Sequence, residues 1–390
     1  MIYDSLLIHT KIWNNLLSSV NSGRLPHALL FHGNDGTGKE AHAIELAALI
    51  NCESPSDNGA CGDCPSCKKI KSFQHGNVKL ILPYPRGKIS SADDPSIRGL
   101  TEKNIEQLRE MMVEKGKNPY ARIEIENART ILINSIREVK KDLYMSSIDK
   151  GWTVVLIFDA EKLCIPQPTG ANALLKVLEE PPEKTIFILV ISEVSAMMDT
   201  IRSRCQQIYF PPLASSFIEE KLIQLDLSED KAKVISNIAN GDIRLALNLS
   251  ENIDELFSDL KLMIKACYSP SPSTWQAVTI RTSTLKRKSM SELSYFFRTS
   301  ILYMRDLHLA TNESSNDHFI FTNLTDHFRK VSVDYPHANW NECINILENT
   351  FENIQRNGYL PLMITAMLIE LKQQIVGEKV KPFSINDWIL

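Results

Sequence analysis

A glycine-rich segment near the start of the chain has residue types suited to holding phosphate. Residues 33–40 read GNDGTGKE, directly after an apolar run at 28–31 and at the start of a helical pattern at 39–50. Glycines let backbone N–H groups curl round phosphates, a helix N-terminus favours anions, and the lysine reaches the outer phosphates. This order predicts a P-loop, and the alternative is a glycine-rich turn that binds nothing. The phosphate-binding residues would be Gly33, Gly36, Gly38 and Lys39.

Two positions are wrong for ATP hydrolysis. The residue after the P-loop lysine is normally Ser or Thr, whose hydroxyl holds Mg²⁺, and here it is Glu40. An apolar strand predicted at 153–158 leads into Asp159, the usual carboxylate on the Mg²⁺ side of such a site. The next position should carry the glutamate that activates water, and here it is Ala160. The sequence therefore predicts no self-catalysed hydrolysis, and binding of ATP or ADP that is weak or absent.

Half of the eight cysteines crowd into one short segment. Their spacing is Cys-x8-Cys-x2-Cys-x2-Cys, so two Cys-x2-Cys steps share the middle thiol and bring all four within reach of one tetrahedral ion. In a reducing cytosol such a cluster indicates a metal before a disulfide. The pattern predicts a structural Zn²⁺ site without an open coordination position, and the alternatives are an iron–sulfur cluster or unligated thiols. The four ligands would be Cys52, Cys61, Cys64 and Cys67.

The composition is that of an ordinary soluble protein. The 390 residues suffice for two or three domains. A net charge of −4 argues against a protein that coats DNA by itself, because such proteins are usually basic. The longest apolar runs, such as 186–191, are far shorter than the roughly 20 residues that cross a bilayer. The N-terminus shows no basic segment leading into an apolar one. We expect a cytoplasmic protein with no membrane contact.

Short apolar runs alternate with helical patterns up to about residue 210, which is typical of a buried parallel sheet. Residues from about 84 to 130 interrupt this alternation with a loop and a helical pattern at 101–115, so we interpret them as an insertion. A Pro-Pro pair at 211–212 marks a boundary, after which helical patterns follow one another. The predicted strands lie at 28–31, 78–82, 153–158, 185–191 and 207–210, and the clearest helices at 39–50 and 170–180.

Further segments, taken with the P-loop and the cysteines, resemble one family. They read RLPHALLF at 24–31, NALLKVLEEPP at 172–182, IRSRC at 201–205 and GDIRLAL at 241–247. Together they look like the AAA+ proteins of the bacterial DNA polymerase III clamp loader, in which Ser-Arg-Cys is a signature and a four-cysteine zinc module recurs. The resemblance covers about residues 10–250, apart from the insertion.

The resemblance implies an α/β fold with two all-α domains after it. A RecA-like AAA+ P-loop domain with a zinc module would be followed by a helical lid and then by a helical collar that assembles a ring of subunits. The implied bounds are 1–212 for the AAA+ domain, 52–67 for the zinc module, about 84–130 for the insertion, 213–255 for the lid and 256–390 for the collar.

Within this family, Glu40 and Ala160 resemble the delta-prime subunit, which usually has neither motif intact, whereas the gamma or tau motor has both. The chain departs from many delta-prime P-loops by keeping Lys39 and all three glycines, and the insertion is not general to the family. The implied function is support for loading the sliding clamp onto primed DNA, with gamma or tau and delta as partner subunits. The chain would be part of the DNA polymerase III holoenzyme without being an active ATPase by itself.

The resemblance also assigns roles to single residues. Arg204 maps onto the family's arginine finger, which acts on the nucleotide of a neighbouring subunit, and the alternative is a surface salt bridge. Ser192 maps onto the first sensor position and Arg244 onto the second sensor arginine. For Arg244 the alternative is a charge on a helix surface, because a sensor matters only where nucleotide binds in the same subunit.

Two other functions compete with this interpretation. An active clamp-loader ATPase of the gamma or tau type requires other residues to compensate for Glu40 and Ala160. A small-molecule kinase using the P-loop would not explain the zinc module, the Ser-Arg-Cys motif or the helical C-terminal region.

Overall fold

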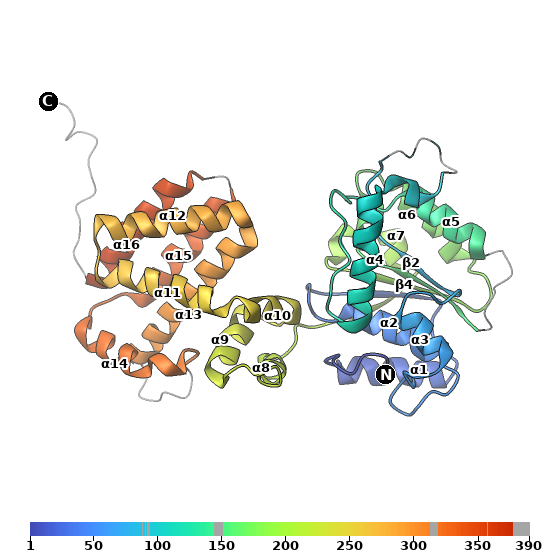
Figure 1. The fold of residues 1–390 in the computed structure, drawn as a ribbon, viewed down its shortest axis with the longest axis horizontal. Coiled ribbons are helices and arrows are strands. Elements are labelled where there is room, and N and C mark those ends of the chain that lie inside the picture. The colour runs from blue at the N-terminus through green and yellow to red at the C-terminus, as the bar shows by residue number, and fades with distance from the viewer. Residues whose placement is uncertain are drawn as a thin grey trace. The chain divides into compact units, whose positions relative to one another are not determined.

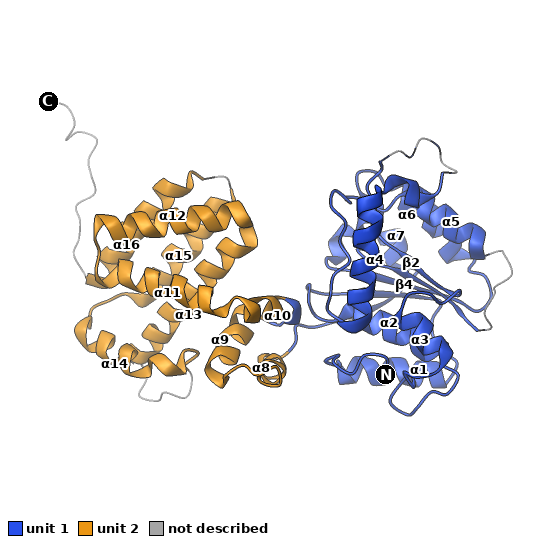
Figure 2. Ribbon diagram, in the orientation of Figure 1, with its two compact units in different colours: residues 1–213, 241–244 blue, residues 214–240, 245–390 orange. Residues whose placement is uncertain are grey.

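The computed structural model describes residues 1–87, 89, 91, 94–143, 151–312, 319–356 and 358–376. The chain forms two compact units, coloured separately in Figure 2: unit 1 holds residues 1–213 and 241–244, and unit 2 holds residues 214–240 and 245–390. Unit 1 is α/β and the described part of unit 2 is helical (Figure 1), so the predicted fold class is confirmed. The further division near residue 255 into lid and collar stays a prediction.

Unit 1 is built on five parallel strands in the order β2-β3-β4-β1-β5. Every residue of the central strand β4 is buried, which is why its sequence TIFILVI is apolar without alternation. The carboxyl ends of parallel strands meet at one edge of the sheet, so the residues that follow β1, β3 and β4 converge there. The strands are β1 Ala28–His32, β2 Val78–Ile81, β3 Thr153–Ile157, β4 Thr185–Ile191 and β5 Gln206–Tyr209.

Helices surround this sheet. Ten of the twelve residues of α2 are buried, and these include the polar side chains of Lys39, His42 and Glu45. The helix predicted at 170–180 is α6, and it ends before the Pro-Pro pair that follows Glu180. The α-helices of unit 1 are α1 Thr10–Asn21, α2 Lys39–Ile50, α3 Pro65–Lys71, α4 Glu102–Lys117, α5 Ile133–Leu143, α6 Thr169–Glu179 and α7 Asp199–Arg202, and its short 3-10 helices are Ser96–Gly99, Ala160–Cys164 and Val194–Ala196.

The predicted insertion contains α4, where a helix was expected. Thr101 and Asn104 form a capping box: each side chain accepts from the other's backbone N–H, at 3.2 Å in both cases. The two ends of the insertion meet, because Tyr84 N donates to Thr130 O at 3.1 Å. The segment 84–130 therefore begins and ends at one place in unit 1, and its status as an insertion stays a prediction.

Unit 2 buries large aromatic side chains between its helices, among them Phe296, Tyr303 and Trp340. No helix in the described ranges is long and apolar enough to span a membrane. The helices are α8 Ser215–Ile223, α9 Glu229–Ala239, α10 Ile243–Glu251, α11 Ile253–Tyr268, α12 Pro272–Lys288, α13 Met290–Asn312, α14 Thr325–Asp334, α15 Trp340–Gln355 and α16 Leu360–Val376, with a 3-10 turn at Thr322–Leu324. The first two residues of α10 belong to unit 1.

Candidate functional site

The P-loop has the backbone shape that its glycines predict. It joins the end of β1 to the start of α2, and Gly36 and Gly38 take left-handed φ values of +69° and +84°. Gly33 has φ +137° and no room for a side chain, because a Cβ there would lie 2.2 Å from the carbonyl oxygen of Phe210. Glycine adopts such conformations far more readily than other residues.

Lys39 turns back onto its own loop. Its ammonium donates to the carbonyl oxygens of Gly33 at 2.6 Å and Asn34 at 2.5 Å. The residue is buried, and this burial lowers the pKa of its ammonium. The lysine that the sequence assigns to a phosphate is therefore bonded to two backbone acceptors.

Glu40, in the first turn of α2, forms an ion pair with Lys115 near the end of α4. Only 1% of the Lys115 side chain is exposed, and its ammonium also donates to Ala121 O at 2.7 Å. Desolvation alone would raise the pKa of Glu40, but the positive charges of Lys115 and Arg244 lower it. The residue at this position normally holds Mg²⁺ through a hydroxyl. Here it is a glutamate whose carboxylate is paired with the Lys115 ammonium.

Asp159 follows β3 and is also paired within the chain. One of its oxygens, Oδ2, accepts from Lys162 Nζ at 2.8 Å and lies 3.7 Å from Arg122 Nη2 of the insertion. Ala160 is fully buried. Glu161 comes next, and burial, with Asp159 as a further cause, raises the pKa of its carboxyl.

Ser192 and Arg244, the predicted sensor residues, line the same small space as Gly36 and Lys39 of the P-loop. Ser192 Oγ donates to Asp35 Oδ1 at 2.6 Å. Desolvation would raise the pKa of Asp35, but that hydrogen bond and the charges of Arg244 and Lys39 lower it. The Asp242 carboxylate covers Gly36, where an added Cβ would come within 1.6 Å of its Oδ1. Thus the carboxylates of Asp35 and Asp242 both lie at the P-loop.

The space left at the P-loop is ≈ 20 Å³, enough for about one water molecule. Pockets that hold drug-sized ligands measure roughly 300–1,000 Å³. The structure brings together the predicted residues Lys39, Glu40, Asp159 and Ser192, and each is bonded to another group of the chain. The residues as arranged do not fit a magnesium nucleotide.

Two histidines contact backbone carbonyl groups of the P-loop, and neither is predicted from the sequence as a site residue. The His42 ring lies 2.8 Å through Nδ1 from Gly38 O, and its Nε2 accepts from His9 N at 3.3 Å. His9 Nε2 in turn lies 2.9 Å from Thr37 O. One donor and one acceptor on the His42 ring specify its neutral form, and burial lowers its pKa to about 4.

The four clustered cysteines come together before and within the first turn of α3. Their sulfurs all lie within 4.8 Å of one another, and the Cys67 sulfur is 3.7 Å from Cys52 Sγ and 3.9 Å from Cys61 Sγ. A tetrahedral ion with Zn–S bonds of about 2.3 Å requires sulfurs about 3.8 Å apart. Backbone N–H groups of Cys61, Cys64 and Cys67 each point at a sulfur of the set. The four positions predicted from spacing therefore fit one metal ion.

Arg204 lies at the surface between α7 and the edge strand β5. Its guanidinium donates to Glu179 Oε1 at 2.7 Å and to Thr200 O at 2.9 Å. Both the Arg204 and the Glu179 side chains are exposed, by 36% and 50%. Exposed ion pairs contribute at most about 1 kcal/mol to stability, so this contact holds Arg204 only weakly.

Comparison with known proteins places the chain in a family. The family model described as DNA polymerase III, delta subunit, matches residues 8–214, more than half of the chain. The chain belongs to this family. It is 30% identical over 260 residues to DNA polymerase III subunit delta′ of Bacillus subtilis. The matched region is 66% of this chain and 64% of that protein.

Two further relatives give the same picture of the family. DNA polymerase III subunit delta′ of Escherichia coli is 27% identical over 61% of this chain and 58% of that protein. DNA polymerase III subunit tau of Bacillus subtilis is 23% identical over 95% of this chain and 61% of that protein. The chain thus spans less than two thirds of the length of each of these relatives.

Lys115 and Arg122 reach the P-loop site of this family member from residues 84–130, and neither is predicted from the sequence. A signal for Lys115 was present. On α4 the apolar side chains Leu108, Met111 and Met112 share one face, and position 115 continues it at helical spacing. A lysine on the buried face of a helix needs a partner. Arg122 follows the helix in irregular chain, where no periodicity marks it.

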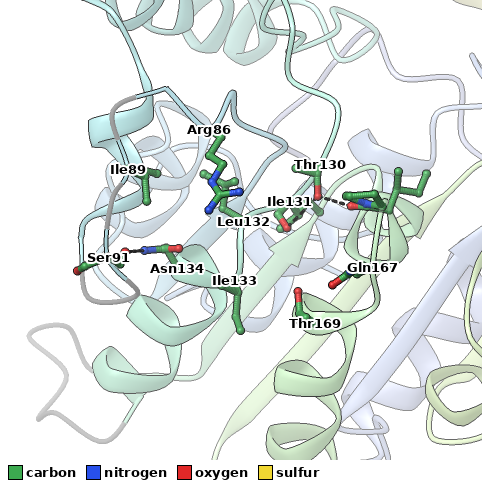
Figure 3. Close-up of a pocket in the computed structure, with 12 residues that line it drawn as sticks. Arg86, Ile89, Ser91, Thr130, Ile131, Leu132, Ile133, Asn134, Gln167 and Thr169 are labelled. Carbon is green, nitrogen blue, oxygen red and sulfur yellow. Dashed lines mark hydrogen bonds between the residues drawn. The ribbon is translucent and has the colours of Figure 1, made fainter.

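A larger cavity of ≈ 470 Å³ lies apart from the P-loop, beside the insertion (Figure 3). Its walls come from the start of the insertion and from residues 130–134 and 165–169. Thr130 Oγ1 donates to Ile165 O at 2.5 Å and Asn134 Nδ2 donates to Ser91 O at 3.1 Å. Arg86 is the only ionisable side chain among its described lining residues, so no acid–base pair is found within that described lining.

Proposed function

We propose that the chain is a delta-prime-type subunit of the DNA polymerase III clamp loader. In this role it supports the loading of the sliding clamp onto primed DNA, with gamma or tau and delta subunits as partners, in the cytoplasm. The family match and the names of its relatives support membership of an assembly rather than the role of a free enzyme.

The state of the P-loop site is the observation that carries this proposal. The side chains that would hold a magnesium nucleotide are bonded within the chain, and the water-activating glutamate is replaced by the buried Ala160. A subunit with such a site does not hydrolyse ATP and contributes to the loader through its neighbours.

In this proposal Arg204 acts on the nucleotide bound by the adjoining subunit of the loader. A guanidinium supplied from outside neutralises the charge that builds on the γ-phosphate, an effect of roughly 10³–10⁵ in GTPases. Arg204 is exposed beside the edge strand, and its ion pair with Glu179 is a weak surface contact. It can therefore exchange Glu179 for a phosphate of the adjoining subunit.

The cysteine cluster holds one structural zinc ion in this proposal. Four thiolates leave no open coordination position, so the metal stabilises the segment between α2 and α3 and takes no part in a reaction.

A reconstituted loader tests the role of Arg204. Arg204→Ala should assemble and retain zinc, but lose most clamp- and DNA-stimulated ATPase activity at the adjoining site. Glu179→Gln is the matched control, because it breaks the same ion pair and leaves the guanidinium in place. Full activity in Arg204→Ala, or an equal loss in Glu179→Gln, would make Arg204 a structural residue.

A second candidate is an active motor of the gamma or tau type. It is favoured by the match to tau, which extends over 95% of this chain. It requires hydrolysis that depends on Lys39, in a site that would have to open first.

A further inference from the structure

Residues 84–130 carry two basic side chains, Lys115 and Arg122, to the carboxylates of Glu40 and Asp159. We propose that Lys115 takes the place of a divalent cation at Glu40, with Arg122 in support at Asp159, so that the site is closed to magnesium whether or not a nucleotide is present. This goes beyond the role in clamp loading, which requires only an idle site.

The charges of the site support an internal cation. A Ser or Thr after the P-loop lysine is neutral, whereas Glu40 adds a second carboxylate to that of Asp159. Two carboxylates facing a P-loop would attract a divalent cation unless positive charge is supplied. Lys115 pairs with Glu40, while Asp159 accepts from Lys162 at 2.8 Å and lies 3.7 Å from Arg122. A lysine ammonium is a compact point charge, like a small ion.

The ammonium of Lys115 is also surrounded by groups that can stabilise a metal cation. Only 1% of its side chain is exposed, it donates to Ala121 O at 2.7 Å, and it lies 5.9 Å from the centre of the Phe158 ring. The carboxylate, the carbonyl and the aromatic face are three groups that stabilise a cation away from water.

The backbone around Lys115 is fixed to the body of unit 1. Tyr3 Oη donates to Lys115 O at 2.9 Å, and Leu7 N donates to Tyr120 Oη at 2.6 Å. Next to the lysine, Gly116 approaches Lys71 so closely that a Cβ would lie 2.6 Å from the Lys71 carbonyl oxygen. The end of α4 is therefore held against the P-loop unit on several sides, and Lys115 is a permanent part of the site.

Binding of a fluorescent ADP analogue to the full chain, in magnesium and in EDTA, tests the proposal. For the wild type we expect the same affinity in both buffers, or no binding in either. The variant Glu40→Thr with Lys115→Met restores the hydroxyl and removes the ammonium without leaving a lone buried charge. It should bind more tightly in magnesium than in EDTA, on the order of ten-fold, as one regained charge-assisted contact provides.

The matched control is Lys117→Met alone, which removes an exposed charge from the same helix and keeps the Glu40–Lys115 pair. It should show no preference for magnesium. The proposal is overturned if the folded, zinc-loaded Glu40→Thr, Lys115→Met chain gains no such preference, or if the control gains as much. Tighter binding in magnesium by the wild type overturns it too, without any variant. All three measurements use the isolated chain, so they are independent of whether it works in a clamp loader.

Discussion

The cysteine cluster and the P-loop site lie in the same unit and were both predicted from short motifs, yet they differ in where their partners come from. In the cysteine cluster, the sulfurs in contact belong to residues no more than 15 positions apart. At the P-loop, Glu40 is paired with a lysine 75 positions away and Ser192 with an aspartate 157 positions away. A closed metal site is thus specified locally, whereas the state of a nucleotide site is decided by distant segments.

The largest expected effect comes from removing one thiolate from the cysteine cluster, which tests whether the four cysteines form one metal site. Cys64→Ser should lower bound zinc from one equivalent to a small fraction. It should also cost several kcal/mol of stability, because structural zinc contributes its binding energy to folding. Metal analysis and thermal unfolding give the two readouts. Cys164→Ser, at a half-buried cysteine outside the cluster, is the control and should keep its zinc. Iron in the purified protein, or zinc well under one equivalent, would contradict a zinc site.

The pairing of Glu40 with a lysine from a distant segment is tested by Lys115→Met. This change leaves the Glu40 carboxylate unpaired in a largely buried place, which typically costs about 3–5 kcal/mol. Adding Glu40→Gln should restore much of the loss, because no lone charge then remains. Chemical denaturation measures both. Lys117→Met should change stability little, and an equally small effect of Lys115→Met would mean that the buried pair contributes little.

These two sites also show what the sequence can and cannot predict. The strands, the helix after the P-loop, the helix in the insertion and the four metal-ligand positions follow from apolar runs, glycines and spacing within about 20 residues. The pairing of Lys115 with Glu40 depends on how the insertion folds back across the end of the sheet. No local pattern carries that information, although a lysine on the apolar face of α4 hints at a buried partner.

A smaller effect on stability is expected from pH, through His42, which contacts the P-loop backbone. Burial lowers the pKa of His42 from 6.5 to about 4, so the folded state binds fewer protons than the unfolded state between these values. The stability that neutral His42 provides is complete above pH 6.5 and is lost as the pH falls towards 4, by up to about 3 kcal/mol. Burial raises the pKa of Glu45 on the same helix to about 7, which gives an opposite slope from about pH 4.5 to 7.

Because the two slopes offset each other in the wild type, a difference between variants isolates His42. The stability of the wild type relative to His42→Gln should shrink as the pH falls from 7 to 4. The exposed His27→Gln is the control substitution. A wild-type advantage that stays constant across this range would show that His42 does not titrate as its burial requires.

The most direct test of the central claim, that this family member keeps a P-loop whose site is filled by its own side chains, is the steady-state ATPase rate of the isolated chain beside Lys39→Ala. We predict that both rates equal background, because Lys39 is bonded to its own loop and Ala160 supplies no base. A wild-type rate above background that Lys39→Ala abolishes would contradict it and make the chain a motor subunit.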